Sequence, residues 1–250
     1  MSVKIIVDSC SDIKPDEAEK AGLCLLPLSV SIDGCEYLDG VTITHNEFYT
    51  MLEKCKTLPS TSQITPYSYE MALDEVMKNG DDALIITISS KLSGTYSSAV
   101  IAAEKYKDKV YVTDSESATI GEKILVEYAV KLKNDGLSAK EIYEKLEQCK
   151  KNICVIALVD TLEYLQKGGR ISKTASVVGG MLGIKPVLAV KNGEVVMLGK
   201  ARGSKQSNNY LNELIKKSGN IDFSMPYMLG YSGLDDTPLK KYISDSKSVW

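Results

Sequence analysis

Two hydroxyl-rich segments contain the residues of this sequence best suited to hold a ligand. They are residues 59–63, which include Thr61 and Ser62, and residues 88–99, which include Ser93. Each segment leads into a predicted helix, and a helix N-terminus offers free backbone amides and a dipole that favour anions. Hydroxyls and amides together could hold a carboxylate or a phosphate. Each segment could instead simply cap its helix, which composition alone favours.

The second segment joins a predicted buried strand directly to a helix. Residues 83–88 form the continuous apolar run that is typical of a parallel strand covered on both faces. Gly94 follows six residues later and would let a ligand approach the backbone closely. Ligands bind at the carboxyl edge of open parallel sheets. If residues 59–63 lie at the same edge, the hydroxyls of both segments converge on one ligand.

Common catalytic patterns are absent from the sequence. It contains no G-x-x-x-x-G-K-[ST] phosphate loop, no G-x-G-x-x-G after a strand and no G-x-S-x-G elbow. His45 is the only histidine, which excludes a histidine-rich metal site, and the six cysteines form no C-x-x-C pair. A serine without a base is inert. We therefore expect no enzyme, and a lipid or acyl-ester hydrolase using Ser93 is the alternative.

Arginine is scarce in this chain. Arg170 and Arg202 are the only arginines among 30 basic residues. A chain that otherwise uses lysine for positive charge could need a planar guanidinium fork at these two positions. The sequence leaves open whether each arginine contacts a ligand or supports the fold.

The order of the predicted elements indicates an α/β protein with two domains. Strands and helices alternate over residues 1–160, which predicts a three-layer α/β/α domain with a mostly parallel sheet that carries the hydroxyl segments. Beyond Asp160 the pattern changes to a hairpin around Asn192-Gly193, a strand around residues 227–231 and further helices. We therefore expect residues 161–250 to form a smaller two-layer α/β domain with a mixed sheet.

Composition and charge limit the classes of partner and the cellular compartment that we expect for this protein. A formal net charge of −3 argues against a nucleic-acid binder, which usually carries a basic surplus. No apolar run approaches the roughly 20 residues needed to cross a bilayer. The N-terminus lacks the charged start and apolar run of a signal peptide, so we expect a cytoplasmic protein.

Six segments with distinctive motifs run in order through the whole chain. They are residues 6–9, 59–63, 88–96, 112–115, 162–171 and 184–186. Three of them contain P-S-T-S-Q, S-S-x-L-S-G-T and L-E-Y-L-x-K-G-G-R, and these blocks together are highly specific. The chain in this respect resembles the DegV family of bacterial fatty-acid-binding proteins. The resemblance implies an α/β/α N-terminal domain, a smaller α/β C-terminal domain, and one long-chain fatty acid in a tunnel between them.

The resemblance also implies residue roles and a partner. Thr61 and Ser93 would bind the carboxylate, with Ser62 and the Gly94 amide nearby and Arg202 a candidate at the tunnel mouth. Family members need no cofactor, and some present the fatty acid to a separate fatty-acid kinase. A small-anion or nucleotide binder that uses the same hydroxyl segments is a further reading of the residues.

Two C-terminal features bear on the tunnel. A small-residue helix predicted over residues 172–182 could line the tunnel or pack closely on a sheet. Family members continue a few dozen residues beyond the position of Trp250, through another strand and a glycine-rich segment with a histidine near the head group. The sequence leaves open whether the chain is truncated there or lacks that strand. It determines neither acyl-chain length and saturation, nor the kinase partner, nor the oligomeric state.

Overall fold

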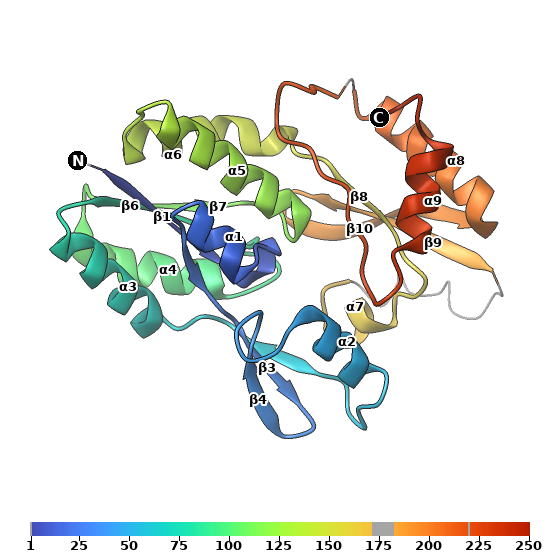
Figure 1. Ribbon diagram of the computed structural model, residues 1–250, viewed down its shortest axis with the longest axis horizontal. Helices are drawn as coiled ribbons and strands as arrows, with labels where there is room; N and C mark the ends of the chain where they lie inside the picture. Colours follow the sequence, from blue (N-terminus) through green and yellow to red (C-terminus); the bar gives the residue numbers. More distant parts are fainter. Residues whose placement is uncertain (1, 172–182, 220) are drawn as a thin grey trace.

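A four-stranded parallel sheet forms the centre of the N-terminal half of the molecule (Figure 1). The computed structural model describes residues 2–171, 183–219 and 221–250. The strand order is β2-β1-β6-β7, with β1 (Val3–Asp8), β2 (Cys24–Leu26), β6 (Asp82–Thr87) and β7 (Val110–Asp114). The helix predicted over residues 172–182 as a possible tunnel lining lies outside the described residues.

Helices cover both faces of this sheet because the central strands are apolar on both sides. On β6, Leu84 and Ile86 pack against α5 and α6, whereas Ala83 and Ile85 pack against α3 and α4, as the twofold alternation of a strand requires. The helices are α1 (Pro15–Lys20), α3 (Pro66–Lys78), α4 (Thr95–Ala103), α5 (Ile120–Asn134) and α6 (Ala139–Cys149). The predicted α/β/α arrangement is confirmed.

A second sheet contains three strands in the order β10-β9-β8. The strands are β8 (Val155–Leu158), β9 (Ile184–Lys191) and β10 (Glu194–Arg202), accompanied by α7 (Glu163–Lys167), α8 (Gly203–Lys217) and α9 (Thr237–Asp245). Its described strands are all antiparallel, whereas a mixed sheet was expected. β8 pairs with β9 rather than with the parallel sheet, so this sheet begins before Asp160. An apolar run does not reveal which sheet a strand joins, and the domain boundary near Asp160 stays a prediction.

The strand predicted around residues 227–231 is wrong. This stretch is irregular, and Tyr227 and Tyr231 are about half exposed. A strand persists only when a neighbour satisfies its backbone hydrogen-bonding groups. In the part of the chain that the structure describes, no strand pairs with this stretch.

A third, small sheet sits below the parallel sheet in Figure 1 and carries one of the hydroxyl segments. It consists of β3 (Ser29–Ile32), β4 (Cys35–Leu38) and β5 (Ser60–Ser62), with α2 (His45–Leu52) packed on it. The Asp33-Gly34 turn joins β3 to β4. The segment that contains Thr61 is part of this sheet, because β5 pairs antiparallel with β3 and places Thr61 opposite Val30.

Three short 3-10 helices complete the described elements: η1 (Ser9–Ser11), η2 (Glu104–Tyr106) and η3 (Lys150–Asn152). Among the helices that the structure describes, none is both long and apolar enough to span a bilayer.

Candidate functional site

The turn after β6 presents Ser93 at the N-terminus of α4. The carbonyl oxygen of Ser89 accepts the amides of Leu92 and Ser93, at 3.0 and 3.1 Å, so the turn is tight. The Ser93 hydroxyl lies 2.9 Å from the Thr95 hydroxyl and accepts the Thr95 amide at 3.3 Å. The N-cap residue of α4 is Gly94, so the Ser93 hydroxyl lies one residue before the cap and does not make the side-chain cap of the first turn of α4 that composition alone favoured. The remaining amides of that turn have no intrahelical acceptor, so an anion could still bind there.

The structure brings the two hydroxyl segments together through Gln63 and Gly94. A Cβ atom added to Gly94 would lie 1.9 Å from Oε1 of Gln63, which shows how closely the Gln63 side chain covers this glycine. The side-chain amide of Gln63 donates to the Ser98 hydroxyl at 2.9 Å, one turn into α4. The end of β5 is thus anchored on the first turns of α4. The two segments therefore touch, but residues 60–62 belong to the small sheet and not to the edge of the parallel sheet, and the convergence of their hydroxyls on one ligand stays a prediction.

The other predicted site residues have different positions. Thr61 and Ser62 lie in β5, where all three residues are exposed. Arg202 ends β10 opposite Ile184 and is also exposed. Among the described residues, no hydrogen bond joins Arg202 to Thr61 or Ser93, so its place at the head group stays a prediction.

Asp8 stabilises the sheet edge from which the turn after β6 emerges. One carboxylate oxygen accepts the Ile88 amide at 2.8 Å and the other accepts the Cys10 amide at 2.9 Å. The side chain is fully buried. Burial raises the pKa of Asp8 from 3.8 to about 6, although the two backbone hydrogen bonds oppose the shift. Asp8 thus binds backbone amides and joins the ends of β1 and β6.

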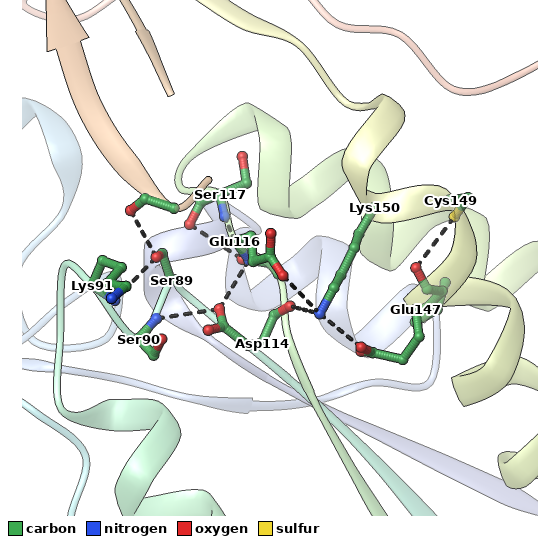
Figure 2. A network of polar contacts seen from close by, with 12 residues as sticks. Ser89, Ser90, Lys91, Asp114, Glu116, Ser117, Glu147, Cys149 and Lys150 are labelled. Atoms are coloured by element: carbon green, nitrogen blue, oxygen red, sulfur yellow. Dashed lines mark hydrogen bonds and ion pairs between the residues drawn. The ribbon is translucent and has the colours of Figure 1, made fainter. Parts of the chain in front are cut away.

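A polar network supports the turn from the side of β7 (Figure 2). Asp114 accepts the amides of Ser90 and Glu116, at 3.2 and 2.9 Å. Lys150 donates to the Asp114 carbonyl at 3.0 Å and forms salt bridges with Glu116 and Glu147, at 3.3 and 2.8 Å. Burial acts to lower the pKa of Lys150, but the two glutamates outweigh this effect and raise it. Lys150 had no distinguishing sequence pattern, so reasoning from the sequence missed it.

The C-terminal part of the chain holds the same turn at two points. Nε of Arg170 donates to the Leu92 carbonyl at 3.1 Å, and its guanidinium also bonds the Gly168 carbonyl. The Ser89 hydroxyl donates to the Gly193 carbonyl at 2.8 Å. The scarcity of arginine in the sequence had pointed to Arg170 as a residue with a specific contact, and that contact is with the protein backbone. For Gly193 the sequence predicted only a hairpin turn.

His45, the only histidine in the sequence, is not hydrogen-bonded to Ser93 and so does not serve it as a base. His45 is exposed at the start of α2, whereas the Ser93 hydroxyl pairs with Thr95. Nor does any group of three His, Cys, Asp or Glu side chains in the described ranges have an arrangement that could hold a metal ion. What the site presents is a set of hydroxyl and amide donors.

A pocket of about 300 Å³ opens between α1 and α5. Its lining is mostly apolar, with Glu17 and Lys123 among it, and includes no residue of β5 or of the turn after β6. This pocket is separate from the hydroxyl segments.

Comparison with known proteins identifies the family. The profile of the DegV family, described as uncharacterised proteins, matches residues 2–242. A DegV domain-containing protein of Caldanaerobacter subterraneus is 37% identical over 223 residues, which cover 89% of this chain and 79% of the relative. The chain belongs to the DegV family. One from Clostridium perfringens is 38% identical over 221 residues, which cover 85% of this DegV chain and 76% of the relative. The resemblance based on six ordered segments is confirmed.

Solved DegV structures share the fold and are described by their lipid ligands. A fatty-acid-binding DegV protein from Thermus thermophilus has a TM-score of 0.86 at 29% identity, covering 100% of this chain and 89% of its own. A stearic-acid-binding protein from Eubacterium ventriosum has a TM-score of 0.78 at 33% identity, and the match covers 87% of this chain and 76% of that protein. The Streptococcus pneumoniae fatty acid kinase (Fak) B3 protein, loaded with linoleic acid, has a TM-score of 0.77 at 27% identity, covering 88% and 79%. All three are binding proteins for fatty acids.

Proposed function

We propose that this DegV protein binds one long-chain fatty acid, with its carboxylate at Thr61 and Ser93, and presents that head group to a separate fatty-acid kinase. The observation that carries the proposal is the contact of Gln63 with Gly94, because it places the two hydroxyl segments beside one another at the start of α4. A carboxylate cannot be buried bare, but hydroxyl and amide donors satisfy it. Ser62 and the Gly94 amide are the supporting donors, and Arg202 is the candidate at the mouth.

Burial of the acyl tail would supply most of the affinity. About 14 methylenes at ~0.8 kcal/mol each set an upper limit near 11 kcal/mol for a palmitate-like chain. The proposed tail site is a tunnel between the two domains. The chemistry at the head group then selects a carboxylate, while the tail supplies affinity for a long apolar chain.

Presentation to a kinase accords with the Fak B3 protein among the similar structures. The protein would act as the carrier, and the kinase partner would supply the phosphoryl-transfer chemistry. No cofactor of its own is part of the proposal.

The test is to extract the purified protein with organic solvent and to identify the lipid by mass spectrometry. We expect one long-chain fatty acid per protein chain, either as isolated or after incubation with a fatty-acid mixture. Absence of any acyl chain under both conditions would refute the proposal. Displacement of a bound apolar dye by nucleotide but not by fatty acid would support a small-anion site instead, and turnover of an ester probe lost in Ser93→Ala would support a hydrolase.

A further inference from the structure

One residue of the β9–β10 turn, Gly193, is buried, although its neighbours Asn192 and Glu194 are exposed. Gly193 has a φ of +81° and follows Asn192 at +49°, so the two residues form the tight left-handed turn that the Asn-Gly pair favours. Hairpin tips normally face water. Gly193 is nevertheless buried, because it packs on the turn after β6.

Ser89 is the residue that receives this tip. Its side chain is fully buried, and its hydroxyl donates to the Gly193 carbonyl at 2.8 Å (Figure 2). A Cβ atom added to Gly193 would lie 2.4 Å from the Ser89 hydroxyl oxygen and 3.3 Å from Cγ of Lys91. Only glycine therefore fits at this position while the contact is closed.

Ser89 also sets the shape of the turn that carries Ser93. Its hydroxyl accepts the Lys91 amide at 3.1 Å, and its carbonyl accepts the amides of Leu92 and Ser93. The residue that receives the hairpin tip is thus the one on which the Ser93 backbone is anchored. A change at the tip reaches Ser93 through one side chain and one carbonyl group.

We propose that the contact of Ser89 with Gly193 is a latch between the two parts of the chain. Ser89 and Gly193 are positioning residues: the closed latch holds the Ser93 turn in its ligand-binding shape and limits the rate at which the ligand leaves. The ligand assignment, a long-chain fatty acid, rests on the proposed function. The latch itself rests only on the contacts of Ser89.

The test compares Gly193→Ala with Gly34→Ala. Gly34 occupies the equivalent position of the β3–β4 turn, with a φ of +85° after Asp33 at +48°, but it is exposed and nothing lies within 4 Å of an added Cβ. Both substitutions impose the same backbone strain. Only the one at Gly193 also forces the latch open, so the pair separates the latch from a general loss of stability.

Two measurements test whether the latch acts as proposed. In the ligand-free protein, hydrogen exchange of the Leu92 and Ser93 amides should be at least about fivefold faster in Gly193→Ala than in Gly34→Ala, the effect of losing one buried hydrogen bond. In the fatty-acid-loaded protein, dissociation should be faster by a similar factor, with a smaller change in the association rate.

A second pair removes the hydroxyl without straining the backbone. Ser89→Ala should accelerate amide exchange and ligand release in the same way. Ser11→Ala is its control, because the Ser11 hydroxyl is equally buried and also makes two bonds, to the Asp8 carbonyl at 2.8 Å and from the Ile13 amide at 3.4 Å. We expect Ser11→Ala to leave the Ser93 amide unchanged.

The outcomes separate the latch from the proposed function. If the wild type retains fatty acid but Gly193→Ala and Ser89→Ala match their controls in exchange and release, the latch is refuted and the proposed function stands. If the wild type retains no fatty acid, the proposed function fails and so does the role of the latch in release. Faster exchange and faster release in both test variants support the proposal.

Discussion

At the scale of single residues, the two hydroxyls of the candidate site make the most direct prediction. Hydrogen bonds to a charged group contribute about 1.5–3 kcal/mol each, which corresponds to a roughly 10- to 100-fold change in affinity. Thr61→Ala and Ser93→Ala should each weaken fatty-acid binding by that factor, measured by displacement of a fluorescent fatty acid. Ser244→Ala, at an exposed serine of α9, is the control. Unchanged affinity in either variant would remove that residue from the site.

Glu122 is the second residue that leads to a prediction, because its carboxyl group is buried without a partner. It lies in the first turn of α5, is fully buried, and has no hydrogen-bond partner for either carboxylate oxygen among the described residues. Burial raises the pKa of Glu122 well above its usual 4.5, and the charges of Asp8 and two further aspartates add to the effect. The folded protein therefore favours the neutral acid.

This raised pKa predicts how stability depends on pH. Above pH 4.5 the unfolded chain loses the Glu122 proton while the folded chain keeps it, so stability falls as pH rises toward the folded pKa, by about 1.4 kcal/mol per pH unit. Asp8 and Asp12 also have raised pKa values, of about 6, so they contribute to the fall in stability mainly below pH 6. Glu122→Gln should reduce the fall that sets in as pH rises above 4.5 in urea unfolding, because glutamine is neutral throughout. Parallel slopes for the two proteins would contradict the assignment.

At the scale of elements, β5 and α4 are coupled through one side chain. Gly94 has ordinary helical backbone angles, so alanine there carries no backbone strain. The added Cβ would instead displace the Gln63 amide, which is the end of a flexible side chain, from its bond to Ser98. The local pattern at both segments predicted helix caps, but the N-cap residue of α4 is Gly94 and Ser93 makes no side-chain cap there. The coupling between the segments needed the fold.

A double-mutant cycle tests this coupling. Gly94→Ala should lower the free energy of unfolding by about 1 kcal/mol through the loss of the Gln63 hydrogen bond. In the Gln63→Ala background the same substitution should cost close to nothing, since no side chain remains to be displaced. Urea denaturation of the four proteins measures the interaction energy, and additive losses would show that Gln63 does not cover Gly94.

At the scale of the whole molecule, the proposed tail site predicts a dependence on chain length. Each two-methylene extension of a saturated fatty acid should raise affinity by up to about 15-fold, at ~0.8 kcal/mol per buried methylene. The gain should stop at the length that fills the tunnel. A series from 10 to 20 carbons, measured by competition, locates that length. A flat series would show that the tail stays in water, and a head-group site alone would then explain binding.

The sequence by itself determined the features that depend on local pattern. The apolar run of β6, the Asn192-Gly193 turn and the hydroxyl segments with Thr61 and Ser93 are each readable within about a dozen residues, because strand alternation, turn chemistry and capping are local effects. The ordered motifs added the family, and with it the expected ligand. The parallel sheet with helices on both faces followed from the alternation of elements.

Only the tertiary structure decided which of these parts touch. Ser89 and Gly193 are 104 residues apart, and no local pattern shows that a glycine of one hairpin turn is buried against a distant turn. The same holds for Gln63 over Gly94 and for β8, whose apolar residues suit either sheet. Such contacts are set by how whole elements pack, and an individual segment carries no record of its partner. The hydroxyls could therefore be named from the sequence, while the residues that position them could not.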